Sequence, residues 1–208
     1  MRYFTPRLFS SIMAVALAFG VSSCTTKPGG AAGKYSTTFD PPVGEVRNPS
    51  ALRVKLSTGA QRVYVVEGDR VILATPCSVG TASDPTPKGN FTIYHKNATR
   101  RRQSSPGAGY PMSYWMEFKT AYGMHWGFVK PFPCTHGCVR LPVKSAKKIF
   151  DLVRVGTPLN ISTSQPEDAT VGRTLPILDD SQMPDPPNSY MLSPQVFHDA
   201  ARGKLYHY

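Results

Sequence analysis

Short apolar runs with a period of two residues constrain the fold of this chain more than any other feature of its sequence. In the first run, Leu52, Val54 and Leu56 alternate with Arg53 and Lys55. Such alternation is typical of a strand with one buried face. Similar runs bounded by turn residues predict strands at residues 52–56, 62–67, 70–74, 90–95, 114–119, 123–127 and 159–162.

A helical period is clear at one place only. Pro142 stands where a first-turn proline is tolerated, and Ala146, Ile149 and Val153 follow it as an apolar stripe. Residues 100–109 begin with three arginines and continue with Ser, Pro and Gly, which indicates an exposed loop. The predicted fold is therefore mainly β, a β-sandwich or mixed sheet with one short helix.

The N-terminus carries the pattern of an export signal. Arg2 and Arg7 form a basic region, and residues 8–20 form an apolar run that is short for a bilayer span. The run ends in Val-Ser-Ser-Cys, which resembles the lipobox of bacterial lipoproteins. Residues 1–23 are therefore predicted to be a lipoprotein signal peptide and Cys24 the lipid-modified residue. The alternative is an ordinary cleaved signal peptide in which Cys24 has no role.

The predicted chain has four parts. A signal peptide at residues 1–23 precedes a lipid-anchored flexible linker at 24–50, which is rich in Gly and Pro. The folded domain spans residues 51–163, and residues 164–208 form a Pro-rich C-terminal tail. We expect the protein to be exported to the bacterial cell envelope and lipid-anchored at the periplasmic face of the inner or outer membrane.

The charge of the chain is strongly basic. Removal of the signal peptide takes away two arginines and no acid, so the net charge falls from +11 to +9. A positive surface attracts a partner rich in negative charge, such as anionic lipid or a carboxylate-bearing cell-wall polymer. Export excludes nucleic acid as the expected partner. The sequence carries no signal for an oligomeric state.

The densest chemical signal is a cysteine flanked by two histidines. Cys138 follows His136 by two residues, and His125 lies at the end of a preceding predicted strand. An imidazole that removes the thiol proton makes the thiolate, which is the nucleophile. His136 would share a face with Cys138 in an extended segment, whereas His125 can approach across a sheet. Gly137 leaves backbone N–H groups unobstructed, which suits an oxyanion site.

The segment around Cys138 also resembles a known signature. Residues 135–141 read Thr-His-Gly-Cys-Val-Arg-Leu, similar to the Ser/Thr-His-Gly-Cys-Val/Ile-Arg motif of L,D-transpeptidases of the YkuD type. Residues 86–91, Thr-Pro-Lys-Gly-Asn-Phe, resemble a second segment of that family, and Gly-Thr-Pro at 156–158 fits as well. The resemblance covers residues 51–163 and identifies them as an L,D-transpeptidase catalytic domain.

The resemblance implies an activity on peptidoglycan stem peptides. Cys138 would attack the carbonyl of the third residue of a tetrapeptide, release D-alanine and hold the rest as a thioester. An amine on a second stem or on an attached protein would then resolve it, giving a 3–3 cross-link or protein attachment. An L,D-carboxypeptidase, with water as acceptor, is one alternative. A peptidoglycan-binding lipoprotein that has lost catalysis is another.

The same resemblance assigns roles to the neighbouring residues. His125 would be the general base and acid. Thr135, His136 and Gly137 would shape the pocket and the oxyanion site. For Arg140 it implies orientation of the loop or contact with a substrate carboxylate. Trp126, which separates His125 from the glycine that usually follows it in the family, is expected to be a wall of the cleft.

The remaining cysteines leave one question open. Cys77 and Cys134 would lie near the active-site end of the domain, and an exported protein permits a disulfide between them. Two buried free thiols are the alternative. No CxxC pair and no zinc-finger spacing occurs, so no metal ion or cofactor is expected.

Overall fold

The computed structural model of the chain describes Met1 and residues 35–205. The predicted lipidation site Cys24 and nearly all of the predicted signal peptide lie outside the described residues, so those predictions stay untested. Within the described part of the chain, no helix is both long and apolar enough to span a bilayer.

The first sheet has five strands in the order β3-β2-β1-β9-β4. Neighbouring strands run antiparallel, except that β1 and β9 are parallel. The strands are β1 (Leu52–Ser57), β2 (Arg62–Glu67), β3 (Arg70–Pro76), β4 (Gly89–Thr92) and β9 (Pro158–Ser162). The strands predicted at residues 62–67 and 70–74 thus form a hairpin, with its turn at residues 68–69.

The second sheet has four strands in the order β5-β6-β7-β8. They are β5 (His95–Arg101), β6 (Pro111–Lys119), β7 (Tyr122–Trp126) and β8 (Val139–Leu141). The pairs β5–β6 and β6–β7 are antiparallel, whereas β7 and β8 are parallel. The parallel pair matters for the site, because it sets the start of β8 beside the middle of β7.

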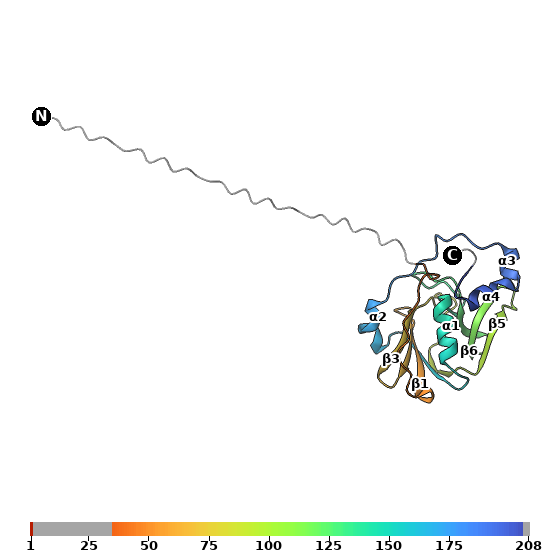
Figure 1. The fold of residues 1–208 in the computed structure, drawn as a ribbon, viewed down its shortest axis with the longest axis horizontal. Helices are drawn as coiled ribbons and strands as arrows, with labels where there is room; N and C mark the ends of the chain where they lie inside the picture. The colour runs from red at the N-terminus through yellow and green to blue at the C-terminus, as the bar shows by residue number, and fades with distance from the viewer. Residues whose placement is uncertain (2–34, 206–208) are drawn as a thin grey trace. The chain divides into compact units, whose positions relative to one another are not determined.

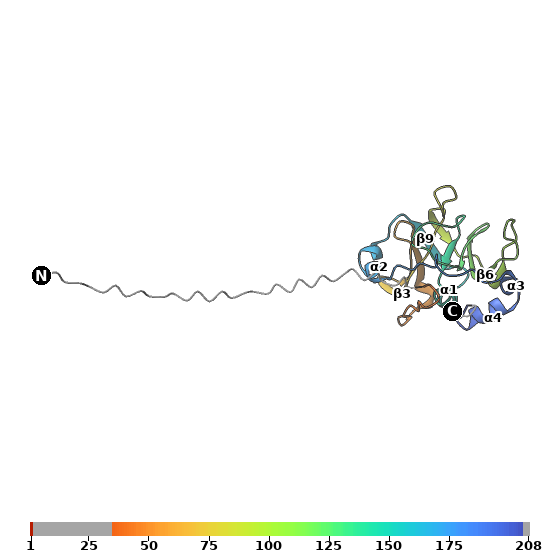
Figure 2. The same cartoon turned by 90° about the horizontal axis from the view of Figure 1, so that it is seen from above.

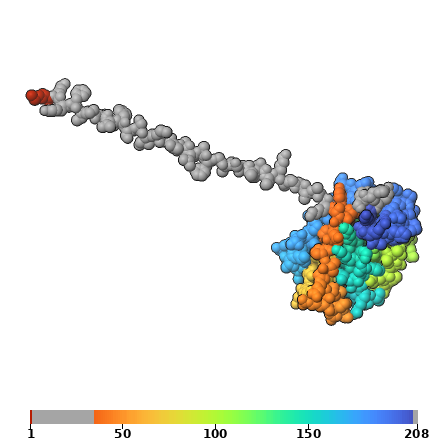
Figure 3. All heavy atoms as spheres, viewed as in Figure 1, coloured from red at the N-terminus to blue at the C-terminus, as the bar shows by residue number. Residues whose placement is uncertain are grey.

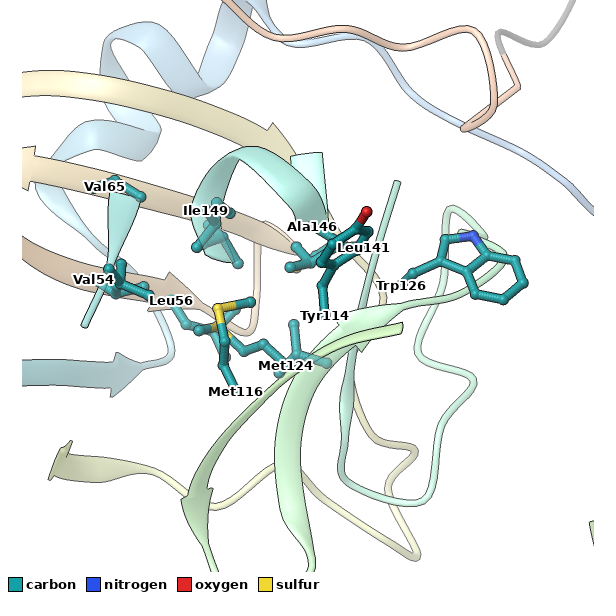
Figure 4. Packing of buried hydrophobic residues seen from close by; sticks show 14 of the residues in the cluster. Val54, Leu56, Val65, Tyr114, Met116, Met124, Trp126, Leu141, Ala146 and Ile149 are labelled. Carbon is teal, nitrogen blue, oxygen red and sulfur yellow. The ribbon is translucent and has the colours of Figure 1, made fainter. Parts of the chain in front are cut away.

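Helix α1 (Val143–Leu152) lies between the two sheets, as Figures 1 and 2 show. Its buried face consists of Val143, Ser145, Ala146 and Ile149. In Figure 4, Ile149 and Ala146 point toward Val54 and Leu56 of the first sheet and toward Met116 and Met124 of the second. The main core cluster therefore joins both sheets through the helix, and a smaller one of Tyr64, Val66 and Ala74 lies on β2 and β3.

Residues beyond β9 carry short helices that pack onto this domain. They are η2 (Pro166–Ala169), α2 (Val171–Thr174), α3 (Asn188–Leu192) and α4 (Gln195–Ala201). Met191, Val196, Ala200 and Leu205 join the main core cluster. Figure 1 shows α2 beside β3, and α3 and α4 beside β5 and β6, so this segment touches both sheets.

The segment before β1 also lies on the domain. Ser36 is fully buried and donates to the carboxylate of Asp180, which also accepts a hydrogen bond from the N–H of Val129 at 2.7 Å. Asp40 makes ion pairs with Lys144 and Lys148 of α1. Figure 3 shows this orange stretch running across the surface next to the teal of α1.

Two predictions about strand positions need correction. The strand predicted at residues 90–95 is divided between β4 and β5, with the fully buried Ile93 at the passage from one sheet to the other. Arg100 and Arg101, predicted to begin an exposed loop, end β5 and pair with Met112 and Pro111 of β6. The mainly β fold with a helix directly after residue 142 is confirmed.

Candidate active site

The parallel pairing of β7 and β8 brings the cysteine and the upstream histidine together. His125 pairs with Arg140, and Met124 with Val139, so Cys138 lies at the level of Gly123. Two paired residues of neighbouring strands project from the same face of the sheet, and so do two residues that are two positions apart along one strand. His125, Arg140 and Cys138 therefore project from one face of the sheet, and all three line one cavity.

That cavity has a volume of about 280 Å³. Besides Cys138 and His125 it is bordered by the cysteine turn, by the end of β5 and by the loop that follows it. Its lining consists of Arg100, Arg102, Gln103, Ser104, Tyr110, Met112, Trp115, Ala121, His125, Thr135, His136, Cys138 and Arg140. A cavity of this kind beside a thiol and an imidazole can hold the reacting part of a peptide.

His125 is buried and oriented by its own neighbour. Its Nδ1 lies 2.5 Å from the carbonyl oxygen of Trp126, and a carbonyl can only accept, so Nδ1 carries the proton. Burial, only partly offset by that bond, lowers the pKa of His125 to about 4. The ring is thus neutral at pH 7, and Nε2 keeps the lone pair that a general base needs.

The thiol of Cys138 is half-buried, and its Sγ lies 3.8 Å from the carbonyl oxygen of Ala121. Burial raises the pKa of the Cys138 thiol, although the N–H of Gly123 and the charges of Arg140, Arg102 and Arg100 act in the opposite direction. A neutral thiol and a neutral imidazole therefore line the same cavity.

Thr135 holds the turn that presents Cys138. Its hydroxyl donates to the carbonyl oxygen of Cys138 at 2.6 Å and accepts from the N–H of Gly137 at 3.1 Å. Thr135 is itself buried, and its backbone pairs with that of Gly80. The turn is therefore fixed both internally and against the neighbouring loop.

Gly137 is required by the conformation of this turn. Its φ is +96°, and a Cβ there would lie 2.4 Å from Cε1 of Tyr122. Because the backbone turns at Gly137, residues 136–138 are not extended, and His136 does not share a face with Cys138 by strand alternation. His136 is exposed at the cavity edge.

The backbone N–H groups of the cysteine turn differ in whether they are already hydrogen-bonded. The N–H of Gly137 is engaged by Thr135, whereas the N–H groups of His136 and Cys138 have no acceptor among residues 35–205. These two N–H groups are the ones left to stabilise negative charge on an attacked carbonyl.

The expectation that Trp126 forms a wall of the cleft is wrong. Trp126 alternates with His125 on β7, is fully buried on the core face and does not line the cavity. Figure 4 shows its indole at one end of the core cluster. The aromatic wall is Trp115 of β6 instead, whose ring centroid lies 5.7 Å from that of His125.

Cys77, Cys134 and Cys138 are free thiols in the structure. Cys77 is fully buried, and burial raises its pKa well above the ordinary range. Of the two alternatives for Cys77 and Cys134, the structure therefore has the unpaired form. Within the described residues, no group of three or more His, Cys, Asp and Glu side chains could hold a metal ion.

Comparisons with known proteins find one family. The family profile of the YkuD L,D-transpeptidase catalytic domain matches residues 51–161. A curated protein of Bacillus licheniformis, named as an L,D-transpeptidase YkuD, is 28% identical over 124 residues, which cover 56% of this chain and 70% of that protein.

One solved structure agrees at the level of the fold, and a second is similar in sequence. A crystal structure of an L,D-transpeptidase from Stackebrandtia nassauensis is 23% identical with a TM-score of 0.50, and the match covers 60% of each chain. L,D-transpeptidase 1 of Mycobacterium tuberculosis is 27% identical with a TM-score of 0.47, covering 53% of this chain and 61% of that one. The chain thus spans about three fifths of the length of these structures.

Proposed function

The chain belongs to the YkuD family of L,D-transpeptidase catalytic domains, and from that membership we propose that it is a peptidoglycan L,D-transpeptidase with Cys138 as nucleophile and His125 as general base and acid. One observation carries the assignment of residues. The parallel β7–β8 pair sets a neutral, oriented imidazole and a thiol on one face beside a cavity.

Acylation follows from the positions of these groups. Sγ of Cys138 attacks the carbonyl carbon of the third residue of a donor tetrapeptide while Nε2 of His125 takes the thiol proton. The N–H groups of Cys138 and His136 stabilise the oxyanion of the tetrahedral intermediate. When the intermediate collapses, the peptide bond breaks, the imidazolium returns the proton to the leaving D-alanine amine, and a thioester remains.

Transfer runs through the same groups in reverse order. An acceptor amine attacks the thioester, His125 takes its proton, and the sulfur leaves as the thiol after receiving that proton. An amine on a second stem gives a 3–3 cross-link, and an amine on a protein gives attachment to the wall. If water takes the place of the amine, the same acyl-enzyme gives a tripeptide, which is L,D-carboxypeptidase activity.

The base role of His125 rests on orientation rather than on proximity in sequence. His136 is nearer along the chain, but it is exposed and follows no strand geometry that would direct it toward Sγ. We expect His125→Ala to lose acylation at neutral pH and His136→Ala to retain it. Retained acylation in His125→Ala would move the base role to His136.

A tetrapeptide muropeptide tests the function directly. The protein is incubated with it and the products are followed by mass, with Cys138→Ala as control. Release of D-alanine by the native protein alone supports the enzyme, and a dimer rather than a tripeptide identifies transfer. A protein that binds sacculi but never forms an adduct on Cys138, even with a carbapenem, would be a binding protein without catalysis.

We also propose that Cys24 carries a lipid that holds the catalytic domain at the envelope membrane. The lipobox-like sequence supports this, and the net charge of +9 after removal of residues 1–23 favours an anionic wall polymer as partner. Fractionation of cells and the mass of the N-terminal peptide test it. A protein released in soluble form, with an unmodified or absent Cys24, contradicts the anchor.

A further inference from the structure

The cavity beside Cys138 has a strongly one-sided charge. Three arginines line it, Arg100 from β5, Arg102 from the loop after it, and Arg140 from β8, and no Asp or Glu is among the described residues that line it. All three lie near enough to Sγ to favour the thiolate of Cys138. Such a concentration of guanidinium groups around a peptide-sized cavity points to an anionic substrate.

Arg100 is held rigidly in this lining. Its guanidinium lies over the ring of Trp115, with Cζ 4.7 Å from the ring centroid. Trp115 is almost fully buried and its Nε1 donates to Oε2 of Glu117 at 3.1 Å, so the ring is a fixed platform. Stacking on an aromatic face leaves the in-plane N–H groups of a guanidinium directed outward.

The same guanidinium lacks a partner that satisfies it. Nε of Arg100 is buried and has no hydrogen bond to any described residue, and its ion pair with Glu117 is 3.9 Å long, beyond hydrogen-bond range. Glu117 itself is engaged, because it accepts from Trp115 and from the N–H of Ala121 at 3.1 Å. Because Arg100 lines the cavity and its guanidinium makes no hydrogen bond to a described residue, the guanidinium keeps donors for an acceptor on a ligand.

Arg102 extends this surface from the loop. Its Nε donates to the carbonyl and hydroxyl oxygens of Ser104, at 3.1 and 3.0 Å, which fixes its side chain against the loop backbone. Its Nη groups make no hydrogen bond to any residue in the described part of the chain. Arg102 therefore adds positive charge to the same cavity that Arg100 lines.

We propose that Arg100, supported by Trp115 and assisted by Arg102, is a specificity-determining residue that binds a carboxylate of the donor stem other than that of its terminal D-alanine. The inference rests on the proposed transpeptidase function. Peptidoglycan stems offer two such groups, the free carboxylate of the glutamyl residue and a carboxylate on the side chain of the diamino acid. Amidation of either removes the charge and the bidentate acceptor that a guanidinium recognises.

Matched donor peptides test this on the full chain. Three tetrapeptide donors are compared, one with both carboxylates free, one amidated at the glutamyl residue and one amidated at the diamino acid, and kcat/KM is measured from D-alanine release. We expect the native protein to prefer the free donor over one of the amidated donors by about 10- to 100-fold. The donor that loses activity identifies which carboxylate Arg100 binds.

Variants separate recognition from folding. Arg100→Gln should abolish the preference, because the free donor loses the guanidinium that binds it and slows more than the disfavoured amidated donor; the remaining turnover of the amidated donor shows that the variant is folded. Arg100→Lys should recover only part of the preference, because an ammonium lacks the planar fork. Arg53→Gln, an exposed arginine of β1 away from the cavity, should keep the full preference.

Two results overturn the inference in different ways. If the native protein releases D-alanine from all three donors equally, or if Arg100→Gln slows all three alike, the enzyme stands and the carboxylate site is absent. If no donor is processed and no adduct forms on Cys138, the proposed function fails and the inference fails with it.

Discussion

Nδ1 of His125 donates a hydrogen bond to the carbonyl oxygen of its neighbour Trp126 over 2.5 Å. The backbone thus orients this histidine, whereas papain-like thiol proteases use an amide side chain for that role. The bond fixes the tautomer and therefore directs the lone pair of Nε2 away from Trp126. Burial then keeps the ring neutral by lowering its pKa to about 4.

The lowered pKa of His125 predicts a loss of stability in mild acid. The unfolded chain binds the proton at the ordinary pKa of 6.5, and the folded chain only near 4. Stability from this group is therefore complete above pH 6.5 and is lost as the pH falls toward 4. We expect its contribution to the free energy of unfolding to fall by about 2 kcal/mol between about pH 7 and pH 5.

His125→Asn isolates that contribution, since its side-chain amide can still donate to the carbonyl of Trp126. Urea unfolding near neutral pH and near pH 5 is measured for both proteins, so that all other titrations cancel in the difference. The native protein should lose more stability than the variant over this interval. An equal loss in both would mean that His125 is not buried as a neutral ring.

The thiol of Cys138 is expected to react slowly at neutral pH in the free protein. Because burial raises its pKa, the thiolate fraction should keep increasing above about pH 8.5, the ordinary value for a cysteine. The rate of alkylation by iodoacetamide is measured as a function of pH from the mass of the peptide that contains Cys138. If the alkylation rate reaches half of its maximum at a pH below 7, a thiolate–imidazolium pair is already formed in the free protein, which would contradict the neutral pair.

Thr135 should be more important for positioning the sulfur than for chemistry. Thr135→Val removes the bonds to the carbonyl of Cys138 and from the N–H of Gly137, and we expect acylation by a carbapenem to slow by about 10- to 100-fold. Thr135→Ser keeps the hydroxyl and should stay near the native rate. Similar rates for Val and Ser would show that the hydroxyl does not hold the turn.

Substitution of Gly137 and Gly156 by alanine separates the cost of backbone strain from the cost of a steric clash. Gly137→Ala combines a φ of +96° with a Cβ 2.4 Å from Tyr122, whereas Gly156→Ala has the same φ with no atom within 4 Å. Backbone strain alone costs about 1–2 kcal/mol. Gly137→Ala should therefore lower the free energy of unfolding clearly more than Gly156→Ala, as measured by urea denaturation. Equal losses would mean that the ring of Tyr122 moves aside freely.

Much of this site follows from the sequence because strands have a simple period. The strand predicted at residues 123–127 matches β7 to within one residue at each end. Its buried Met124 pairs with Val139 of β8, and this register sets His125 and Cys138 on one face. The family motif at residues 135–141 then names the chemistry. Strand β8 is only three residues long, too short to show a period of its own. Alternation also explains the error on Trp126. It predicts that the side chains of His125 and Trp126 project from opposite faces of the strand, but it does not say which of the two faces packs on the core.

The missed residues have no periodic signal. β5 reads His-Lys-Asn-Ala-Thr-Arg-Arg and has no apolar alternation, so its sequence favours a loop at Arg100, and only pairing with β6 makes it a strand. Trp115 lies in a predicted strand, but the residue before it, Tyr114, has a φ of +60°, which no pattern of apolar residues indicates. Partners distant in sequence, not local preference, fix both positions.

Arg101 links the C-terminal segment to the loop that borders the cavity. Its Nη1 donates to the carbonyl oxygens of Gly109 and Met191 at 2.8 and 2.9 Å, its Nη2 donates to that of Ser193 at 2.8 Å, and its Cζ lies 4.6 Å from the ring centroid of Phe197. Gly109 belongs to the loop between β5 and β6, and the others to α3, α4 and their junction. One side chain therefore holds two segments together.

Arg101→Met should release both segments at once. Charge-assisted hydrogen bonds are worth about 1.5–3 kcal/mol each, and partial exposure reduces this, so we expect a loss of about 2–3 kcal/mol in the free energy of unfolding. Hydrogen exchange should increase together at residues 102–110 and 188–201. Arg154→Met, an exposed arginine with no side-chain bond among the described residues, is the control. Faster exchange at only one of the two segments would show that Arg101 does not couple them.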